Sequence, residues 1–302
     1  MKVVYYLSPS SFCFGVKRSI DQLNDIITKH QGEKIFCIHA LVHNPKVTQS
    51  FENKWVKFIE NIDEVLDTNA IIIFSAHGTN RTTINKAKEK YQRVYNLECP
   101  FVSKIYLEID SFLEKWVSKF VYIGKEHHQE WRNIIEDIRH KWWEVFICEK
   151  EKQIQNIPYD NNEKFGVLSQ TTLNFAYVQN ILKTIKKDFP EAYVPLSSDV
   201  CKATYERQTV VLQNIDKFKT FVVIWWKESN NTKELYNIGI NNNKKSFYGE
   251  SLDDILQHQK EELFSNDTVA ITGGASTPIE DIKAVFDYYK NNGYEAKILE
   301  LH

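Results

Sequence analysis

Short apolar segments alternate with amphipathic helical patterns along nearly all of this 302-residue chain. Strands that alternate with long helices are typical of parallel sheets joined by crossover helices, so the chain is predicted to be an α/β protein. A chain of this length is also too long for one simple core. The predicted strands are Val3–Leu7, Lys34–His39, Ala70–Ser75, Arg93–Leu97, Lys119–Ile123, Val145–Cys148, Phe165–Leu168, Phe221–Ile224, Thr268–Thr272 and Ala296–Leu299. Helical patterns include Val16–Lys29, Thr82–Tyr91, Val102–Trp116, Phe175–Asp188, Tyr205–Phe218 and Pro278–Asn292.

One arrangement occurs three times: an extended segment, then a cysteine, then a long helix. Cys13, Cys99 and Cys201 occupy the middle position, and the third extended segment is Ala192–Leu196. The cysteines are separated by about the length of one α/β unit. We therefore predict three similar lobes, which comprise residues 14–98, residues 99–197, and residues 1–13 together with 198–302.

The cysteines indicate reduced or metal-binding thiols rather than a disulfide framework. Their number, five, is odd, and no secretory signal precedes them, because the apolar run at the N-terminus is too short. A helix N-terminus favours the thiolate form, which is the form that binds iron or zinc. Cys37 and Cys148 lie inside predicted strands and are interpreted as buried apolar residues.

The spacing of the other three cysteines alone leaves two alternatives open, because no CxxC motif brings two of them together. They are either unrelated core thiols or the ligands of one metal centre. A closed zinc site needs a fourth ligand, whereas three cysteines suit a cubane iron–sulfur cluster in which one iron has no protein ligand.

Charge and hydropathy exclude several partners. The formal net charge is −2, so no overall basic field attracts nucleic acid. No run approaches the about 18 apolar residues of a membrane span. We therefore expect a cytoplasmic protein that binds neither nucleic acid nor a membrane.

Polar residues follow the predicted strands, where α/β sheets place their sites. Imidazoles, hydroxyls and amides of this kind suit a small anionic substrate that contains phosphate, with one acid near the metal. Singly, each is also explained as a helix cap, a turn or a surface residue. The candidates are His43, His77, His128, Glu130, the segments Ser169–Thr172 and Ser229–Thr232, and the glycine-rich turn Gly273–Pro278.

In this order, the motifs resemble the 4-hydroxy-3-methylbut-2-enyl diphosphate reductases, the family of the last enzyme of the non-mevalonate isoprenoid route. The resemblance covers roughly residues 3 to 290, and its specificity comes from the ordered set. The matching pieces are Phe12-Cys13-Phe14-Gly15-Val16-Lys17-Arg18, Val42-His43-Asn44, Phe74-Ser75-Ala76-His77-Gly78, Cys99-Pro100, His128 with Glu130, Gln170-Thr171-Thr172-Leu173, Cys201 with Ala203-Thr204 and Arg207-Gln208, and Gly274-Ala275-Ser276-Thr277-Pro278.

The resemblance implies three lobes in a pseudo-threefold arrangement around a central [4Fe–4S] cluster. Cys13, Cys99 and Cys201 match the cluster ligands. Glu130 matches the acid that relays protons, and Thr171 matches the hydroxyl that supports it. The family also implies a ferredoxin or flavodoxin as electron donor. The residues that match substrate-binding positions are His43, His77, His128, Thr171, Ser229, Asn230, Asn231 and Ser276.

The chain also departs from the family pattern close to these motifs. Ala40 replaces an acidic residue, Gln129 replaces proline, and Asn230 replaces serine. A glycine is replaced within Trp131-Arg132-Asn133, Trp225-Trp226 replaces a segment with a glycine and a small residue, and Asn96-Leu97-Glu98 replaces Asp-Ala-Thr. The sequence therefore indicates a divergent member of the family. A different substrate preference, a different rate and a different electron donor are left open by these departures.

Three alternatives remain open at this point. The first is an enzyme of the same fold that acts on another hydroxylated diphosphate or catalyses a redox-neutral dehydration. The second is a non-catalytic iron–sulfur sensor, and the third is a zinc-stabilised binding protein. Dependence of turnover on a reductant tests the first, and the colour of the purified protein tests the third.

Overall fold

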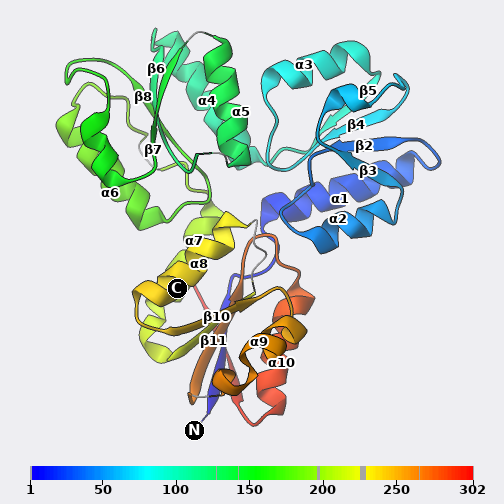
Figure 1. Ribbon diagram of the computed structural model, residues 1–302, viewed down its shortest axis with the longest axis vertical. Coiled ribbons are helices and arrows are strands. Elements are labelled where there is room, and N and C mark those ends of the chain that lie inside the picture. Colours follow the sequence, from blue (N-terminus) through cyan, green and yellow to red (C-terminus); the bar gives the residue numbers. More distant parts are fainter. Residues whose placement is uncertain are drawn as a thin grey trace. The chain divides into compact units, whose positions relative to one another are not determined.

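The computed structural model describes residues 2–126, 128–141, 143–195, 198–224, 229–264 and 266–301. The described residues form three β-sheets in which every paired strand is parallel, flanked by helices (Figure 1). The predicted α/β class is therefore confirmed. The chain divides into two compact units, one formed by Met1–Val16 with Lys202–His302 and the other by Lys17–Cys201. The lobe boundaries predicted above stay a prediction.

The first unit contains a five-stranded sheet in the order β10-β9-β11-β1-β12. Apolar side chains of α7 and α8 pack on one face of this sheet, and those of α9 and α10 pack on the other. The bounds are β1 (Val3–Ser8), α7 (Lys202–Gln213), the 3-10 turn Ile215–Lys217, β9 (Thr220–Ile224), α8 (Asn230–Asn241), β10 (Lys245–Gly249), α9 (Leu252–Leu263), β11 (Thr268–Gly273), α10 (Ile279–Asn291) and β12 (Glu295–Glu300).

The second unit contains two sheets, of order β3-β2-β4-β5 and β7-β6-β8. In the second of these sheets, α4 and α5 pack on one face and α6 packs on the other. The bounds are α1 (Phe14–Lys29, which begins in the first unit), β2 (Ile35–Ile38), α2 (Pro45–Glu52), β3 (Val56–Ile59), the 3-10 turn Ile62–Glu64, β4 (Ile71–Phe74), α3 (Arg81–Lys90), β5 (Arg93–Asn96), α4 (Pro100–Glu114), β6 (Lys119–Ile123), α5 (Gln129–His140), β7 (Glu144–Cys148), the 3-10 turn Glu151–Asn156, β8 (Gly166–Ser169) and α6 (Phe175–Asp188).

Continuous apolar runs explain why the central strands were predictable. Strand β4 reads Ile-Ile-Ile-Phe, and all four of its side chains are buried. A parallel strand covered by helices on both faces needs such a run, because neither face meets water. Every strand predicted from the alternation is present within one or two residues.

Three features of the fold differ from the prediction or were missing from it. Strands β3 and β10 were not predicted, because lysines and a serine interrupt their short apolar patterns. The extended segment expected at Ala192–Leu196 is not a strand: among residues 192–195, only Tyr193 forms an isolated bridge. Pro195 lacks the N–H that a longer ladder needs.

Among the described residues, no helix is sufficiently long and apolar to cross a bilayer.

Candidate active site

The predicted site residues follow the carboxyl ends of strands, where open parallel sheets expose loops. In the second unit, His43 follows β2, His77 follows β4, His128 follows β6, and Thr171 follows β8. Each lies in a short loop, and the first three loops lead directly into α2, α3 and α5. The fold therefore places His43 and His77 on loops of neighbouring strands in one sheet, and His128 and Thr171 on loops of neighbouring strands in another. The sequence separates the four by up to 128 residues.

His43, His77 and His128 form one cluster. The ring centroids of His43 and His77 lie 3.8 Å apart in a stacked geometry, and those of His43 and His128 lie 6.0 Å apart. Burial lowers the pKa of His43 to about 4 and that of His128 to about 3. Burial, and then repulsion by the other two imidazoles, lowers the pKa of His77 well below its usual value. At neutral pH the cluster is therefore uncharged and ready to gain protons when an anion binds.

The orientation of His128 is set by the helix that follows it. His128 is the N-cap of α5, and its Nδ1 accepts a hydrogen bond from the backbone N–H of Glu130 at 3.3 Å. In the neutral ring the proton therefore lies on Nε2. The Nε2 atom of His77 is buried and has no hydrogen-bond partner within the described part of the chain. Such a buried polar atom points to a ligand group that the cluster would bind.

Glu130 is a buried acid held by two hydrogen bonds from one residue. Its side chain is only 4% exposed. The Thr171 hydroxyl donates to Oε2 at 2.7 Å, and the Thr171 N–H donates to Oε1 at 2.8 Å. Burial raises the pKa of Glu130 to about 7, while both hydrogen bonds act in the opposite direction. The carboxyl group can therefore lose and regain a proton near neutral pH, as a general acid requires.

Two of the three candidate cysteines are hydrogen-bonded to these loops. The N–H of Cys201 donates to the carbonyl of Thr171 at 2.9 Å, and Thr171 is the residue that binds Glu130. The N–H of Cys99 donates to the carbonyl of Ala76 at 3.0 Å, next to His77. These backbone hydrogen bonds therefore hold Cys201 next to the loop that contacts Glu130, and Cys99 next to the loop that contains His77.

All three candidate cysteines lie immediately before or at the start of a helix. Cys99 is the N-cap of α4, Cys201 precedes α7, and the Sγ atom of Cys13 accepts a hydrogen bond from the N–H of Val16 in α1 at 3.4 Å. None of the five cysteines, all within the described ranges, forms a disulfide. In contrast to these three half-buried thiols, Cys37 and Cys148 are fully buried in strands.

The donor set fits an iron–sulfur cluster. Thiolates are the ligands of such clusters, and amide groups at a helix N-terminus stabilise the negative charge of the cluster and its sulfurs. The described residues include no group of three His, Cys, Asp or Glu side chains that could hold a single metal ion.

The first unit contains the other predicted donors, at the start of α8 and in the turn after β11. Ser229, Asn230, Asn231 and Ser276 are all buried. Ser229 caps α8, and its hydroxyl lies 2.8 Å from that of Thr232. Hydroxyls and amides at a helix N-terminus suit an anion, since the helix dipole is positive there.

Asn231 connects this helix to the Cys13 loop. Its Oδ1 accepts from the N–H of Ala275 at 3.0 Å, and the carbonyl of Ala275 accepts from the N–H of Cys13 at 3.0 Å. The buried Arg207 also holds this loop by donating to the carbonyl of Ser11. In the first unit, Cys13 is therefore linked to the residues that match substrate-binding positions.

Three further residues hold the loops of the site in place, and only Gln170, within the predicted segment Ser169–Thr172, was among the candidates. Asn133 donates to the carbonyl of Gly78 at 2.8 Å. Gln170 accepts from the N–H of Lys125 through its side chain at 3.1 Å. Thr204 accepts from the Asn231 amide at 2.8 Å. Gln170 and Thr204 belong to the motifs quoted above, whereas no sequence pattern identifies Asn133. Of the departures from the family pattern, Trp225 and Trp226 lie outside the described residues.

Comparison with known proteins agrees with the ordered motifs. The model of the LytB protein family matches residues 4–290. A curated relative from Wolbachia pipientis (subsp. Culex pipiens, strain wPip) is 28% identical over 285 residues, which are 94% of this chain and 90% of the relative. One from Haemophilus influenzae (strain PittEE) is 29% identical over 293 residues, 97% of this chain and 91% of the relative. Both are named 4-hydroxy-3-methylbut-2-enyl diphosphate reductase.

Solved structures share the fold. The E-1-hydroxy-2-methyl-but-2-enyl-4-diphosphate reductase from Plasmodium falciparum matches with a TM-score of 0.89 at 24% identity, over 99% of this chain and 92% of that chain. A second structure, a (E)-4-hydroxy-3-methyl-but-2-enyl diphosphate reductase, matches with a TM-score of 0.67 at 23% identity, over 96% of this chain and 100% of that chain.

Proposed function

The chain belongs to the LytB protein family, and on that premise we propose that it reduces 4-hydroxy-3-methylbut-2-enyl diphosphate. The reaction breaks the allylic C–O bond, consumes two electrons and two protons, and releases water with isopentenyl and dimethylallyl diphosphate. It is the last step of the non-mevalonate isoprenoid route.

One observation carries most of the weight of this proposal. The buried carboxyl of Glu130, with its pKa raised to about 7, is hydrogen-bonded to Thr171. The carbonyl of Thr171 in turn accepts a hydrogen bond from the N–H of Cys201. An acid beside a redox centre is what the removal of a hydroxyl group as water requires. A sensor or a zinc-stabilised binding protein would have no use for it.

Cys13, Cys99 and Cys201 would hold the cofactor, a [4Fe–4S] cluster. When bound, the cluster supplies single electrons and a Lewis-acidic iron that weakens the C–O bond. A small low-potential redox protein, a ferredoxin or a flavodoxin, would deliver the electrons.

The remaining steps belong to side chains of the chain itself. Hydrogen bonds to the diphosphate would come from the residues that match substrate-binding positions, His43, His77, His128, Ser229, Asn230, Asn231 and Ser276. Held in this way, the diphosphate orients the allylic carbon and excludes water. Glu130 would give its proton to the departing hydroxyl. The two hydrogen bonds from Thr171 would then stabilise the resulting carboxylate.

The test is anaerobic purification, optical and paramagnetic-resonance spectra of the protein, and then turnover of the hydroxylated diphosphate with and without a reductant. We expect a brown protein that forms both isoprenoid products only when reductant is present. Turnover without reductant would identify a redox-neutral dehydratase instead. A protein that contains the cluster but does not consume this substrate would reject the proposed reaction.

A further inference from the structure

The loop after β4 continues beyond His77 and is fixed to two helices that begin at the candidate active site. It runs through Gly78 and Asn80 to Arg81, the first residue of α3. One partner helix is α5, which begins after His128 and contains Glu130. The other is α4, whose N-cap is Cys99. The contacts of this loop therefore help to set the distances between His77, Glu130 and Cys99.

On α5, the contacts lie on the same face as the acid. Glu130, Asn133 and Asp137 follow one another at intervals of three and four residues, which places them on one side of a helix. All three are buried. Asn133 donates to the carbonyl of Gly78, and Asp137 Oδ1 accepts from the N–H of Arg81 at 2.9 Å. Asn80 adds a hydrogen bond to Glu136 at 2.7 Å. A shift of the loop along α5 would therefore change the position of His77 relative to Glu130.

On α4, a similar face leads from Cys99 through Tyr106 to Asp110. The spacing of seven and then four residues keeps these positions on one side of the helix. The guanidinium of Arg81 lies 5.0 Å from the centroid of the Tyr106 ring. Its Nη1 and Nη2 atoms donate to the two carboxylate oxygens of Asp110 at 2.7 Å and 2.9 Å.

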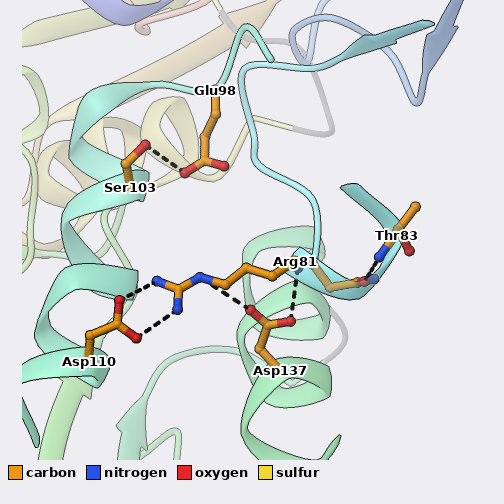
Figure 2. Close-up of polar contacts among 7 residues, drawn as sticks. Arg81, Thr83, Glu98, Ser103, Asp110 and Asp137 are labelled. Atoms are coloured by element: carbon orange, nitrogen blue, oxygen red, sulfur yellow. Dashed lines mark hydrogen bonds and ion pairs between the residues drawn. The ribbon is translucent and has the colours of Figure 1, made fainter. Parts of the chain in front are cut away.

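Arg81 thus contacts both helices with one side chain, as Figure 2 shows. While the fork of the guanidinium binds Asp110, its Nε lies 3.9 Å from Asp137 Oδ2. A lysine has a single ammonium group and cannot reproduce a two-point contact with one carboxylate while it faces another. The arrangement therefore depends on arginine and not only on a positive charge.

We propose that Arg81 is a positioning residue for the diphosphate site, which holds His77 in register with Glu130 on α5 and Cys99 on α4. The proposal rests on the proposed function. Misplacement of a binding group by about 1 Å is enough to lower activity by up to about 100-fold, so a clamp of this kind has a measurable effect without touching the substrate. Asn133, which lies in the segment Trp131-Arg132-Asn133 where this chain departs from the family pattern, would contribute to the same positioning.

The experiment compares Arg81→Ala, Arg81→Lys and Asn133→Ala with the wild type, each as the full chain with its cluster. We expect Arg81→Ala to raise KM for the substrate and the dissociation constant for inorganic pyrophosphate about tenfold, with the brown absorbance retained. We expect kcat to fall less than this. Arg81→Lys should recover part of the loss, and Asn133→Ala should show a smaller change in the same direction.

Arg93→Ala is the matched control. Arg93 is similarly exposed and pairs with Glu33, but it lies at the first residue of β5, the end of the strand opposite to Cys99. We expect it to lower the melting temperature without changing pyrophosphate binding. If Arg81→Ala lowers the melting temperature as Arg93→Ala does and leaves KM and pyrophosphate binding unchanged, Arg81 is only structural and the proposal is wrong.

Pyrophosphate binding separates the two proposals. A wild-type protein that binds pyrophosphate but does not turn over the substrate would reject the reaction, while the variants would still decide the role of Arg81. A wild-type protein that does not bind pyrophosphate would reject the positioning proposal, since there would be no diphosphate site to position.

Discussion

Burial, which hydrogen bonds offset only in part, shifts the pKa values of the individual side chains in the site. Glu130 and the imidazoles of His43 and His128 share one unit of the chain, and burial moves their pKa values in opposite directions. The carboxyl tends to keep its proton, whereas the imidazoles tend to lose theirs. At neutral pH the site therefore combines an acid that can donate a proton with uncharged rings that can accept one.

The first prediction concerns Glu130→Gln. The amide keeps the size of the side chain and can still accept from Thr171, but it has no acidic proton to transfer. We expect the variant to retain the brown absorbance and substrate affinity and to lose at least 100-fold in kcat, the usual contribution of a general acid being about 10² to 10⁴. Steady-state kinetics with a chemical reductant measures this. Wild-type turnover would remove Glu130 from the mechanism.

The second prediction concerns protons taken up by the histidines. In the free protein the pKa values of about 4 for His43 and about 3 for His128 lie below neutral pH, so both rings are uncharged. A bound anion favours the charged form and raises these values. We expect binding to raise them into the range between pH 6 and 8, so that the protein takes up protons. After correction for the protonation of pyrophosphate itself, its affinity should then increase as pH falls from 8 to 6. Calorimetry in buffers of different ionisation enthalpy measures the uptake. Binding that weakens as pH falls over this range would contradict it.

Among secondary-structure elements, the turn after β11 and the start of α8 depend on close backbone approach. A Cβ atom at Gly274 would lie 1.8 Å from the Oγ1 of Thr232 and 2.9 Å from its Cβ. No rotation of the Thr232 side chain relieves the second contact. The two segments can therefore meet only because residue 274 is glycine. Since Ser229 and Ser276 lie on these two segments, this contact determines how they are spaced.

The third prediction is that Gly274→Ala destabilises the protein by about 1 to 3 kcal/mol, as overpacking of a rigid contact does. We also expect it to weaken pyrophosphate binding. Gly32→Ala serves as the control, because Gly32 has a φ of +80° but no heavy atom lies within 4 Å of the place that a Cβ would occupy. That variant should cost about 1 kcal/mol from backbone strain alone and leave binding unchanged. Equal effects of the two variants on binding would contradict the packing argument.

Over the whole molecule, the cysteines fall into two classes. Cys37 and Cys148 are fully buried in β2 and β7, and burial raises the pKa of both thiols, that of Cys148 to about 11. Protonated thiols in a core do not bind iron. The other three are half-buried and lie at helix starts in both units of the chain. These three are therefore the candidate ligands, whereas the two buried thiols are not.

The fourth prediction follows from this division. Cys13→Ser, Cys99→Ser and Cys201→Ser should each lose the brown absorbance and the iron content of the anaerobically purified protein. Cys37→Ala and Cys148→Ala should keep both, with a lower melting temperature because each leaves a small cavity. Optical spectra and iron analysis of the five variants decide the matter. An unchanged spectrum in Cys99→Ser would show that Cys99 is not a ligand.

The sequence by itself determined the α/β class and nearly all of the strands, because buried parallel strands need continuous apolar runs such as Ile71–Phe74. Its ordered motifs also identified the family and the candidate residues, since short segments with a fixed order and chemistry leave few alternatives. It did not predict β3 and β10, whose polar side chains mask their periodicity.

Only the tertiary structure decided which of these residues act together. The stacking of His43 on His77, the two bonds from Thr171 to Glu130, and the contacts of Arg81 with Asp110 and Asp137 join residues that lie 29 to 56 positions apart in the chain. A local sequence pattern contains no information on such contacts. The first two contacts arise because neighbouring parallel strands bring their carboxyl ends to one edge of a sheet. The contacts of Arg81 instead join α3, which follows a strand of one sheet, to α4 and α5, which pack on another.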